Sequence, residues 1–149
     1  MKAGPTLILS TLLGLSHALQ LTDKSWSPCE GQRAVNIVDI SPCDAEPCVL
    51  AQGKKYTVSM SGENGESAVN DVHLNIDGNF AGWVRFANKL VCGSSLTCPV
   101  EPLGKWTLDY TWAVDDSLPL GQSQETKWLL VGNNGASELG CADIIVTIA

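Results

Sequence analysis

Apolar and polar residues alternate along much of the chain, and this two-residue period is typical of strands with one face in a core. In the clearest run, 106–114, aromatic and aliphatic residues occupy every even position: Trp106, Leu108, Tyr110, Trp112 and Val114. Related runs occupy residues 34–40, 55–60, 72–76, 126–131 and 142–148, and 80–86 is a less regular seventh run. No segment after the N-terminal region repeats every 3.6 residues, so the pattern predicts an all-β chain of about seven strands.

Segments rich in Gly and Asn separate these runs and predict turns. They are Ser61-Gly62, Asn64-Gly65, Asp77-Gly78-Asn79 and Gly132-Asn133-Asn134-Gly135. Asn-Gly between two alternating runs is the strongest short signal for a hairpin. Antiparallel strands joined by short turns, without helical crossovers, predict a sandwich of two sheets.

The first 18 residues have the features of a secretory leader. Lys2 gives a positive start, residues 6–15 are largely apolar, and Ser16 and Ala18 are small residues at the positions that a signal peptidase reads. The apolar run is too short for a bilayer, which takes about 20 apolar residues to cross. We therefore expect a signal peptide at 1–18, secretion to the extracellular fluid, and a single domain at 19–149.

The chain is acidic, with 9 Lys and Arg against 16 Asp and Glu and a formal net charge of −7. Loss of Lys2 with the leader makes the mature domain more negative by one charge. Nucleic-acid binding needs clustered Lys and Arg, and anionic membrane surfaces attract basic segments. The charge balance therefore excludes nucleic acid as a general partner and argues against adhesion to an anionic membrane.

All six Cys follow the leader, which is typical of a disulfide framework in an oxidising compartment. Four of them form two close pairs and two lie near the ends of the mature chain: Cys43 and Cys48, Cys92 and Cys98, and Cys29 and Cys141. Spacing alone leaves fifteen pairings open. A zinc site is the alternative, but there is no Cys-x2-Cys pair and His73 is the one His after the leader, so we expect no metal.

Catalytic chemistry finds no support in the sequence. A Ser or Cys nucleophile needs a His beside it, but His73 lies at a polar position of an alternating run, between Asp71 and Asn75. The adjacent carboxylates of Asp115 and Asp116 fit a solvated turn better than a pair that faces across a cleft. We therefore expect a protein that is not an enzyme and that needs no cofactor.

The surroundings of the Cys residues carry a family resemblance. Ser41-Pro42-Cys43, then Pro47-Cys48-Val49-Leu50, Gly53 and Tyr56, resembles the S-P-C…P-C-x-L…G-x-x-Y stretch of the ML (lipid-recognition) superfamily. Cys92…Cys98-Pro99 resembles its second short loop, and Trp128 with Cys141-Ala142 and the strand at 144–148 resembles its ending. The similarity covers about residues 29–148 and is greatest to the soluble Niemann–Pick type C sterol carriers and their arthropod relatives, including the group 2 mite allergens.

This resemblance implies a fold, a disulfide pairing and a ligand. The fold is an immunoglobulin-like sandwich whose sheets enclose one lipid in a hydrophobic cavity. The pairing is Cys29–Cys141, Cys43–Cys48 and Cys92–Cys98. Members carry sterols, fatty acids, phospholipids, gangliosides or lipopolysaccharide. The expected partner is therefore a lipid, with a receptor or membrane acceptor protein as a further possibility, and the protein is expected to be a monomer.

The resemblance and the alternation together predict the residues that line the cavity: Ile40, Trp83, Phe86, Leu108, Trp112, Val114 and Leu118. Ile40 stands where sterol carriers have a pocket Val before Ser-Pro-Cys, and Trp83 falls at or near a loop Phe. Val114 and Leu118 match a Val and a Tyr of the loop after the aromatic strand. Plain core packing is the alternative role for each residue. Arg85 and Lys89 are expected at the mouth, near the polar end of the lipid.

The chain also departs from the family pattern. Ala81-Gly82-Trp83-Val84 replaces a Pro-rich gate, and Leu118 replaces the Tyr of the sterol-binding rim. No Asn is followed by x-Ser or x-Thr, so secretion is favoured over delivery to lysosomes by a glycan tag.

A carrier of a sterol or fatty acid is thus the leading hypothesis. An innate-immune sensor of lipopolysaccharide is an alternative, with Arg85, Lys89, Lys105 and Lys127 available to meet phosphates. An adhesion module with a filled core is a third.

Overall fold

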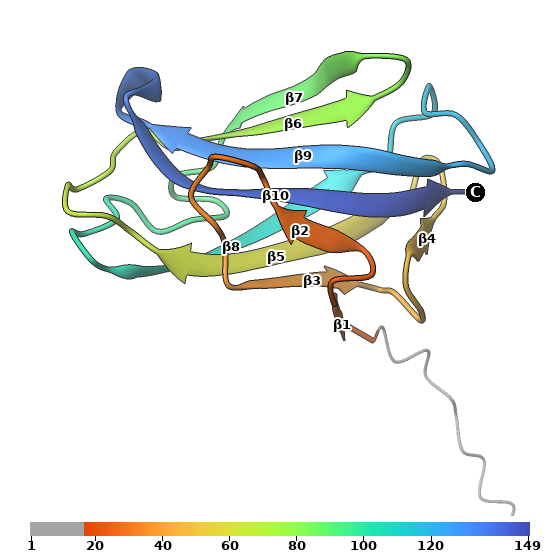
Figure 1. Ribbon diagram of the computed structural model, residues 1–149, viewed down its shortest axis with the longest axis horizontal. Helices are drawn as coiled ribbons and strands as arrows, with labels where there is room; N and C mark the ends of the chain where they lie inside the picture. Colours follow the sequence, from red (N-terminus) through yellow and green to blue (C-terminus); the bar gives the residue numbers. More distant parts are fainter. Residues whose placement is uncertain (1–16) are drawn as a thin grey trace, which may run out of the picture.

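Within residues 17–149, which the computed structural model describes, ten strands form two sheets that face each other across an apolar core (Figure 1). The predicted leader at 1–18 lies outside the described residues except for its last two. Its removal therefore stays a prediction.

The first sheet has the strand order β1-β3-β5-β8. Its strands are β1 (Leu19–Gln20), β3 (Ile37–Ser41), β5 (Lys55–Glu63) and β8 (Lys105–Ala113). The second sheet has the order β2-β10-β9-β6-β7. Its strands are β2 (Trp26–Pro28), β6 (His73–Asn79), β7 (Trp83–Leu90), β9 (Ser123–Gly132) and β10 (Ser137–Ile148), and β4 (Cys48–Leu50) runs parallel to β10. The sheets leave β8 and β7 as free edges on one side of the sandwich.

The predicted alternation sets the inner face of each sheet. In β5, Val58 and Met60 are buried, and Met60 lies opposite the buried Leu108 of β8. In the second sheet, Ile76 of β6 lies opposite Trp128 of β9, which is 1% exposed. These inward positions form one hydrophobic cluster between the sheets.

The seven predicted strands correspond to β3 and to β5 through β10, so the all-β sandwich is confirmed. Two of them are displaced, because β3 begins at Ile37 rather than Ala34 and β7 covers 83–90 rather than 80–86. The strands β1, β2 and β4 were not predicted. Each has only two or three residues, too few to show a period.

Two predicted turns were wrong for a shared reason. Ser61-Gly62 lies inside β5, and Asp77-Gly78-Asn79 lies inside β6. A Cβ on Gly62 would be 2.6 Å from the ring of Trp106, and one on Gly78 would be 2.3 Å from the ring of Phe86. These glycines therefore give room to aromatic rings on a strand instead of reversing the chain.

Of the other two predicted turn segments, one is confirmed and one is wrong. Residues 132–135 form the predicted turn between β9 and β10, with the 3-10 turn η1 (Asn133–Gly135) at its centre. Asn64-Gly65 does not form a hairpin, since it leads from β5 in one sheet toward β6 in the other. The buried Asn64 amide instead donates to the carbonyls of Ser67, Val100 and Glu101 at 2.8, 3.1 and 3.0 Å.

The disulfide pairing that the resemblance implied is confirmed. Cys29–Cys141, Cys43–Cys48 and Cys92–Cys98 are all formed, and no described Cys is free. Cys29–Cys141 joins the segment after β2 to β10 across 112 residues of sequence. The two short bridges close loops beside β4 and after β7.

Candidate functional site

A cleft with apolar and polar walls opens where the free edges of the two sheets meet. Its volume is about 210 Å³, and it is lined from β7, from β8 and from the loop after β8. The lining residues are Phe86, Ala87, Lys89, Tyr110, Thr111, Trp112, Ala113, Asp115 and Leu118. Because β7 and β8 belong to different sheets, the cleft leads from solvent toward the space between them.

The innermost wall of the cleft is continuous with the core. Trp112 and Leu118 line it although each is only 5% exposed. Trp112 packs edge-on against Trp128 of the opposite sheet, with ring centroids 5.3 Å apart and planes at 86°. Displacement of these side chains would therefore open the cleft directly onto the aromatic centre of the sandwich.

A β-bulge brings Phe86 to the cleft. Ile76 of β6 lies opposite Ala87, and the next residue, Asp77, lies opposite Arg85, so Phe86 has no partner in β6. A bulge of this kind re-aims a side chain and bends its strand. The Phe86 ring lies over Gly78 and packs against Phe80 at 5.5 Å between centroids.

Four polar side chains line the cleft: Lys89, Tyr110, Thr111 and Asp115. Lys89 lies opposite the fully buried Leu74 in the β6–β7 register, and this places it on the inward-facing side of the sheet. Tyr110 packs edge-on against Trp128 at 6.1 Å between centroids, and burial raises the pKa of its phenol above the ordinary value of 10.0. The hydrogen bond that Asp115 accepts from the Ser117 backbone at 2.7 Å lowers the pKa of its carboxyl, so Asp115 is ionised at neutral pH.

The structure brings together some of the predicted site residues and separates others. Phe86, Lys89, Trp112 and Leu118 line the cleft. Ile40, Leu108 and Val114 lie deeper, in the hydrophobic cluster, and are at most 2% exposed. They contribute to the interior behind the cleft but not to its present surface.

Trp83 and Arg85 lie on the opposite, outward face of the second sheet. The Nζ of Lys127 is 4.5 Å from the centroid of the Trp83 ring. Arg85 Nε donates to Asp77 Oδ1 at 2.8 Å. Arg85 is therefore engaged in an outer-face ion pair, and Lys89 alone of the two predicted cations reaches the cleft.

Five residues that line the cleft were not predicted: Ala87, Tyr110, Thr111, Ala113 and Asp115. Among them, Tyr110 packs against Trp128 of the core. It shares the inward parity of Leu108 and Trp112 in the 106–114 run, and this signal was available. Its position beside the free edge of the sheet, which follows from the strand order, makes it part of the cleft.

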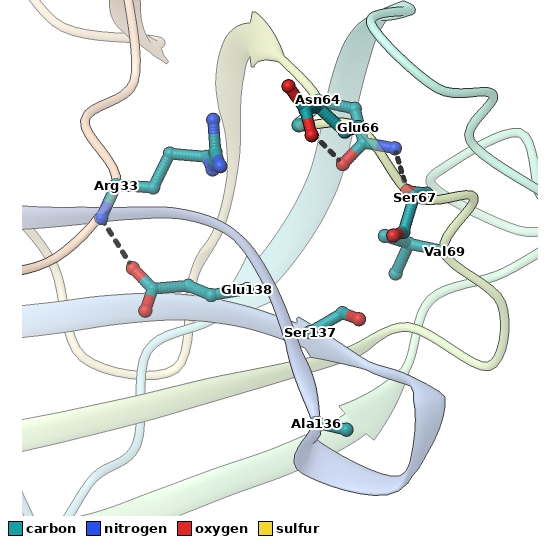
Figure 2. Close-up of a pocket in the computed structure, with 9 residues that line it drawn as sticks. Arg33, Asn64, Glu66, Ser67, Val69, Ala136, Ser137 and Glu138 are labelled. Carbon is teal, nitrogen blue, oxygen red and sulfur yellow. Dashed lines mark hydrogen bonds between the residues drawn. The ribbon is translucent and has the colours of Figure 1, made fainter.

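A second, polar cleft of about 540 Å³ lies at the far end of the sandwich, between the segment after β5 and the β9–β10 turn (Figure 2). Three of the polar side chains that line it, Asn64, Ser137 and Glu138, are engaged in local hydrogen bonds. Glu138 accepts the backbone N–H of Arg33 at 2.6 Å. The Asn64 amide donates to the carbonyl of Ser67 in its own loop and to those of Val100 and Glu101 before β8. Apolar walls are scarce there, with Val69 and Ala136 as the main contributors, so this cleft suits a hydrophobic ligand poorly.

Two further features bear on chemistry. Among residues 17–149, no group of three His, Cys, Asp or Glu side chains is arranged to hold a metal ion. No helix in that part of the chain is both long and apolar enough to cross a membrane. The side chains of the cleft offer apolar surface, three hydrogen-bond donors (Lys89, Tyr110 and Thr111) and one carboxylate, which are groups that can bind a ligand.

Comparisons with known proteins identify similar chains. Residues 23–148 match the family model described as the ML domain. The structure is similar to a Niemann-Pick type C2 protein from Japanese carpenter ant, with a TM-score of 0.69 and 21% identity over 83% of this chain and 98% of that one. It is also similar to chicken MD-1 complexed with lipid IVa, with a TM-score of 0.60 and 10% identity over 89% of this chain and 98% of that one. No curated protein matches the sequence.

Proposed function

Because the chain belongs to the ML-domain family, we propose that it is a secreted lipid carrier that encloses one hydrophobic ligand, a sterol or a fatty acid, between its two sheets. The observation that carries the proposal is the cleft between the free edges of β7 and β8. It is apolar where it meets the core and polar at its rim, as the binding site of an amphipathic ligand should be.

Uptake of a whole lipid requires the cleft to widen. Its 210 Å³ is below the range of about 300–1,000 Å³ for pockets that enclose drug-sized ligands. The strand β7 is suited to move, because it pairs only with β6 and is interrupted by the bulge at Phe86. In the proposed mechanism, outward movement of Phe86 and Leu118 admits the tail toward Trp112 and Trp128.

The driving force is the removal of apolar surface from water. At about 25 cal/mol per Å², burial of about 400 Å² of lipid tail yields on the order of 10 kcal/mol before the cost of ordering the ligand and opening the cleft. The backbone groups of the strands remain paired in the sheets, so the interior can accept an apolar ligand without leaving buried donors unsatisfied. No bond is made or broken, and the role is that of a carrier rather than an enzyme.

We propose that the protein acts outside the cell. A disulfide-bonded domain behind a predicted leader fits an oxidising compartment. We propose that the protein acts there as a monomer, and that a receptor or a membrane acceptor protein receives the lipid.

Recognition of lipopolysaccharide is the second candidate, because the similar MD-1 structure is a complex with lipid IVa. Phosphorylated lipids need several cations at the mouth of the site. Here Lys89 shares the cleft with the anionic Asp115, while Arg85 and Lys127 lie on the outer face. The arrangement disfavours a lipid whose headgroup carries several phosphates.

Filling the cleft provides the test. Ala87 lies on its wall opposite Ile76, and Ala87→Phe should place a ring where the ligand enters. The matched control is Ala136→Phe, which places the same ring in the polar cleft at the other end. We expect saturable 1:1 uptake of dehydroergosterol or cis-parinaric acid by the wild type and by Ala136→Phe, and weakened uptake by Ala87→Phe. No uptake of either probe by the folded wild type would refute the carrier and leave the module with a filled core.

A further inference from the structure

An indole N–H without a partner is buried in the sandwich, at the end of β8 that is remote from the cleft. We infer that the preferred ligand is a lipid with a carbonyl oxygen at or near the end of its tail. In this arrangement the Nε1–H of Trp106 donates a hydrogen bond to the tail oxygen. The inference rests on the proposed function and deepens it, because it assigns the carrier a polar contact at the deep end of the space between the sheets.

Trp106 is unusual among the indoles of the protein. It is 4% exposed, and its Nε1 has no acceptor at hydrogen-bond distance within residues 17–149. Buried donors in native proteins are almost always paired, because an unpaired one is costly. Two other indoles follow this rule: Trp26 donates to the carbonyl of Leu21 at 3.1 Å, and Trp128 donates to Thr126 Oγ1 at 2.9 Å. An acceptor carried in by a ligand would remove the cost at Trp106.

The Trp106 ring lies between the two sheets. Its Cζ2 would be 2.6 Å from a Cβ on Gly62 of β5 and 3.0 Å from one on Gly140 of β10, which belongs to the second sheet. Glycine at both positions leaves room for the indole. The other unpaired buried side-chain atoms of residues 17–149 lie elsewhere, since Asn75 has the outward parity of β6 and Ser25 precedes β2. The Trp106 N–H is therefore the unpaired donor that lies among the inward side chains.

The spacing along β8 suits a long chain. Trp112 lines the cleft, and Trp106 is six residues away at the same inward parity of the strand. At about 3.4 Å per residue, the two positions are about 20 Å apart, which is comparable with the length of an extended long-chain lipid. Leu108 lies between them and is fully buried. A tail that enters past Trp112 therefore runs along apolar side chains and ends beside the indole.

The pairing of donor and tail oxygen selects the ligand. A plain hydrocarbon tail leaves the Trp106 N–H unpaired, whereas a carbonyl oxygen accepts from it and brings no donor of its own. Without this N–H, the same oxygen would itself be unsatisfied in an apolar interior. A single hydrogen bond thus removes two penalties, one on the protein and one on the ligand.

Two acids with the same head and chain length isolate the tail oxygen. They are hexadecanoic acid and 15-oxohexadecanoic acid, and we expect the folded wild type to bind the oxo acid at least as tightly as the plain acid. Trp106→Phe keeps a ring but removes the N–H. It should weaken binding of the oxo acid roughly tenfold relative to the plain acid, the effect of an unsatisfied polar group in the interior. The control Trp26→Phe removes an N–H that is already paired with Leu21 and should keep the ratio of the wild type.

Nuclear magnetic resonance of the wild type gives a second measurement that does not depend on the fold of a variant. The assigned indole N–H resonance of Trp106 should move downfield when hexadecanoic acid is replaced by the oxo acid, because the proton becomes hydrogen-bonded. The Trp26 resonance should stay in place, since its N–H is paired in both complexes.

The outcomes separate this inference from the proposed function. The tail-oxygen contact is refuted by an oxo acid that binds the wild type tenfold more weakly than the plain acid, by an unchanged ratio in Trp106→Phe, or by an unmoved Trp106 resonance. Each of these results leaves the carrier intact, as does binding of dehydroergosterol but of neither acid, which also refutes the contact. Failure of the wild type to bind either acid or dehydroergosterol overturns the carrier itself.

Discussion

Gly78 controls the position of Phe86, so Gly78→Ala tests the geometry of the cleft. A Cβ at this position would be 2.3 Å from Phe86 Cζ and 2.6 Å from Phe80 Cε2. Carbon atoms in contact lie about 3.5 Å apart or more. The Phe86 ring must therefore move by about 1.2 Å and the Phe80 ring by about 0.9 Å.

The sign of the stability change caused by Gly78→Ala shows whether the new Cβ meets the Phe86 ring or open space. Ala in place of a strand Gly stabilises by about 0.5–1 kcal/mol when nothing is in the way. Overpacking costs about 1–3 kcal/mol, so the net expected change is a loss of about 0.5–2 kcal/mol in the free energy of unfolding. This corresponds to a fall in Tm of roughly 2 to 6 °C for a domain of this size. Affinity for a lipid should fall too, because Phe86 moves at the wall of the cleft.

Thermal denaturation followed by circular dichroism measures the change, and a double-mutant cycle identifies its cause. In a Phe86→Leu background, which lacks the nearest ring atoms, Gly78→Ala should cost at least about 1 kcal/mol less. An unchanged or raised Tm for Gly78→Ala would refute the contact between Gly78 and Phe86. If Gly78→Ala lowers stability equally in the wild type and in Phe86→Leu, the Phe86 ring is not the source of the loss.

Three further predictions follow from the described contacts. Asn64→Ala removes a buried amide that bonds three carbonyls and should lower stability by about 2–3 kcal/mol in urea denaturation; a loss below about 0.5 kcal/mol would contradict this role. Replacement of both Cys29 and Cys141 by Ser should lower the free energy of unfolding by about 4–5 kcal/mol. The Cys29–Cys141 disulfide closes a much longer loop than Cys43–Cys48 does, so a smaller loss than for replacement of Cys43 and Cys48 would contradict the dependence on loop length. Because the folded state holds the Tyr110 proton more tightly than the unfolded state does, this residue's contribution to stability is complete below pH 10 and is lost as pH rises above it. Absorbance titration at 295 nm should therefore show a phenol that ionises above pH 10 in the wild type and is missing in Tyr110→Phe.

Local pattern was sufficient to predict the seven longer strands, although the bounds of β3 and β7 were displaced. The alternation at 106–114 marks Leu108 and Trp112 as inward, and both are buried in the core. This worked because burial of one face of a strand leaves its signal within a few residues of sequence. The disulfide pairing came from the family resemblance, since spacing alone left it open.

Structural features that depend on a neighbouring strand could not be predicted from the local sequence pattern. The bulge at Phe86 exists only relative to β6, and it separates the outward Trp83 and Arg85 from the inward Ala87 and Lys89. Gly78 has the sequence of a turn, and only the position of the Phe86 ring shows why glycine stands in a strand. The membership of Tyr110 in the cleft likewise depends on which strand forms the edge of the sheet.

Native mass spectrometry of the secreted protein, followed by solvent extraction and identification of the lipid, tests the central claim most directly. The account predicts a 1:1 adduct whose extra mass is released by extraction, and a sterol or a fatty acid as the main species. A protein that carries no lipid, and that takes up neither dehydroergosterol nor cis-parinaric acid while its three disulfides are intact, would contradict the account.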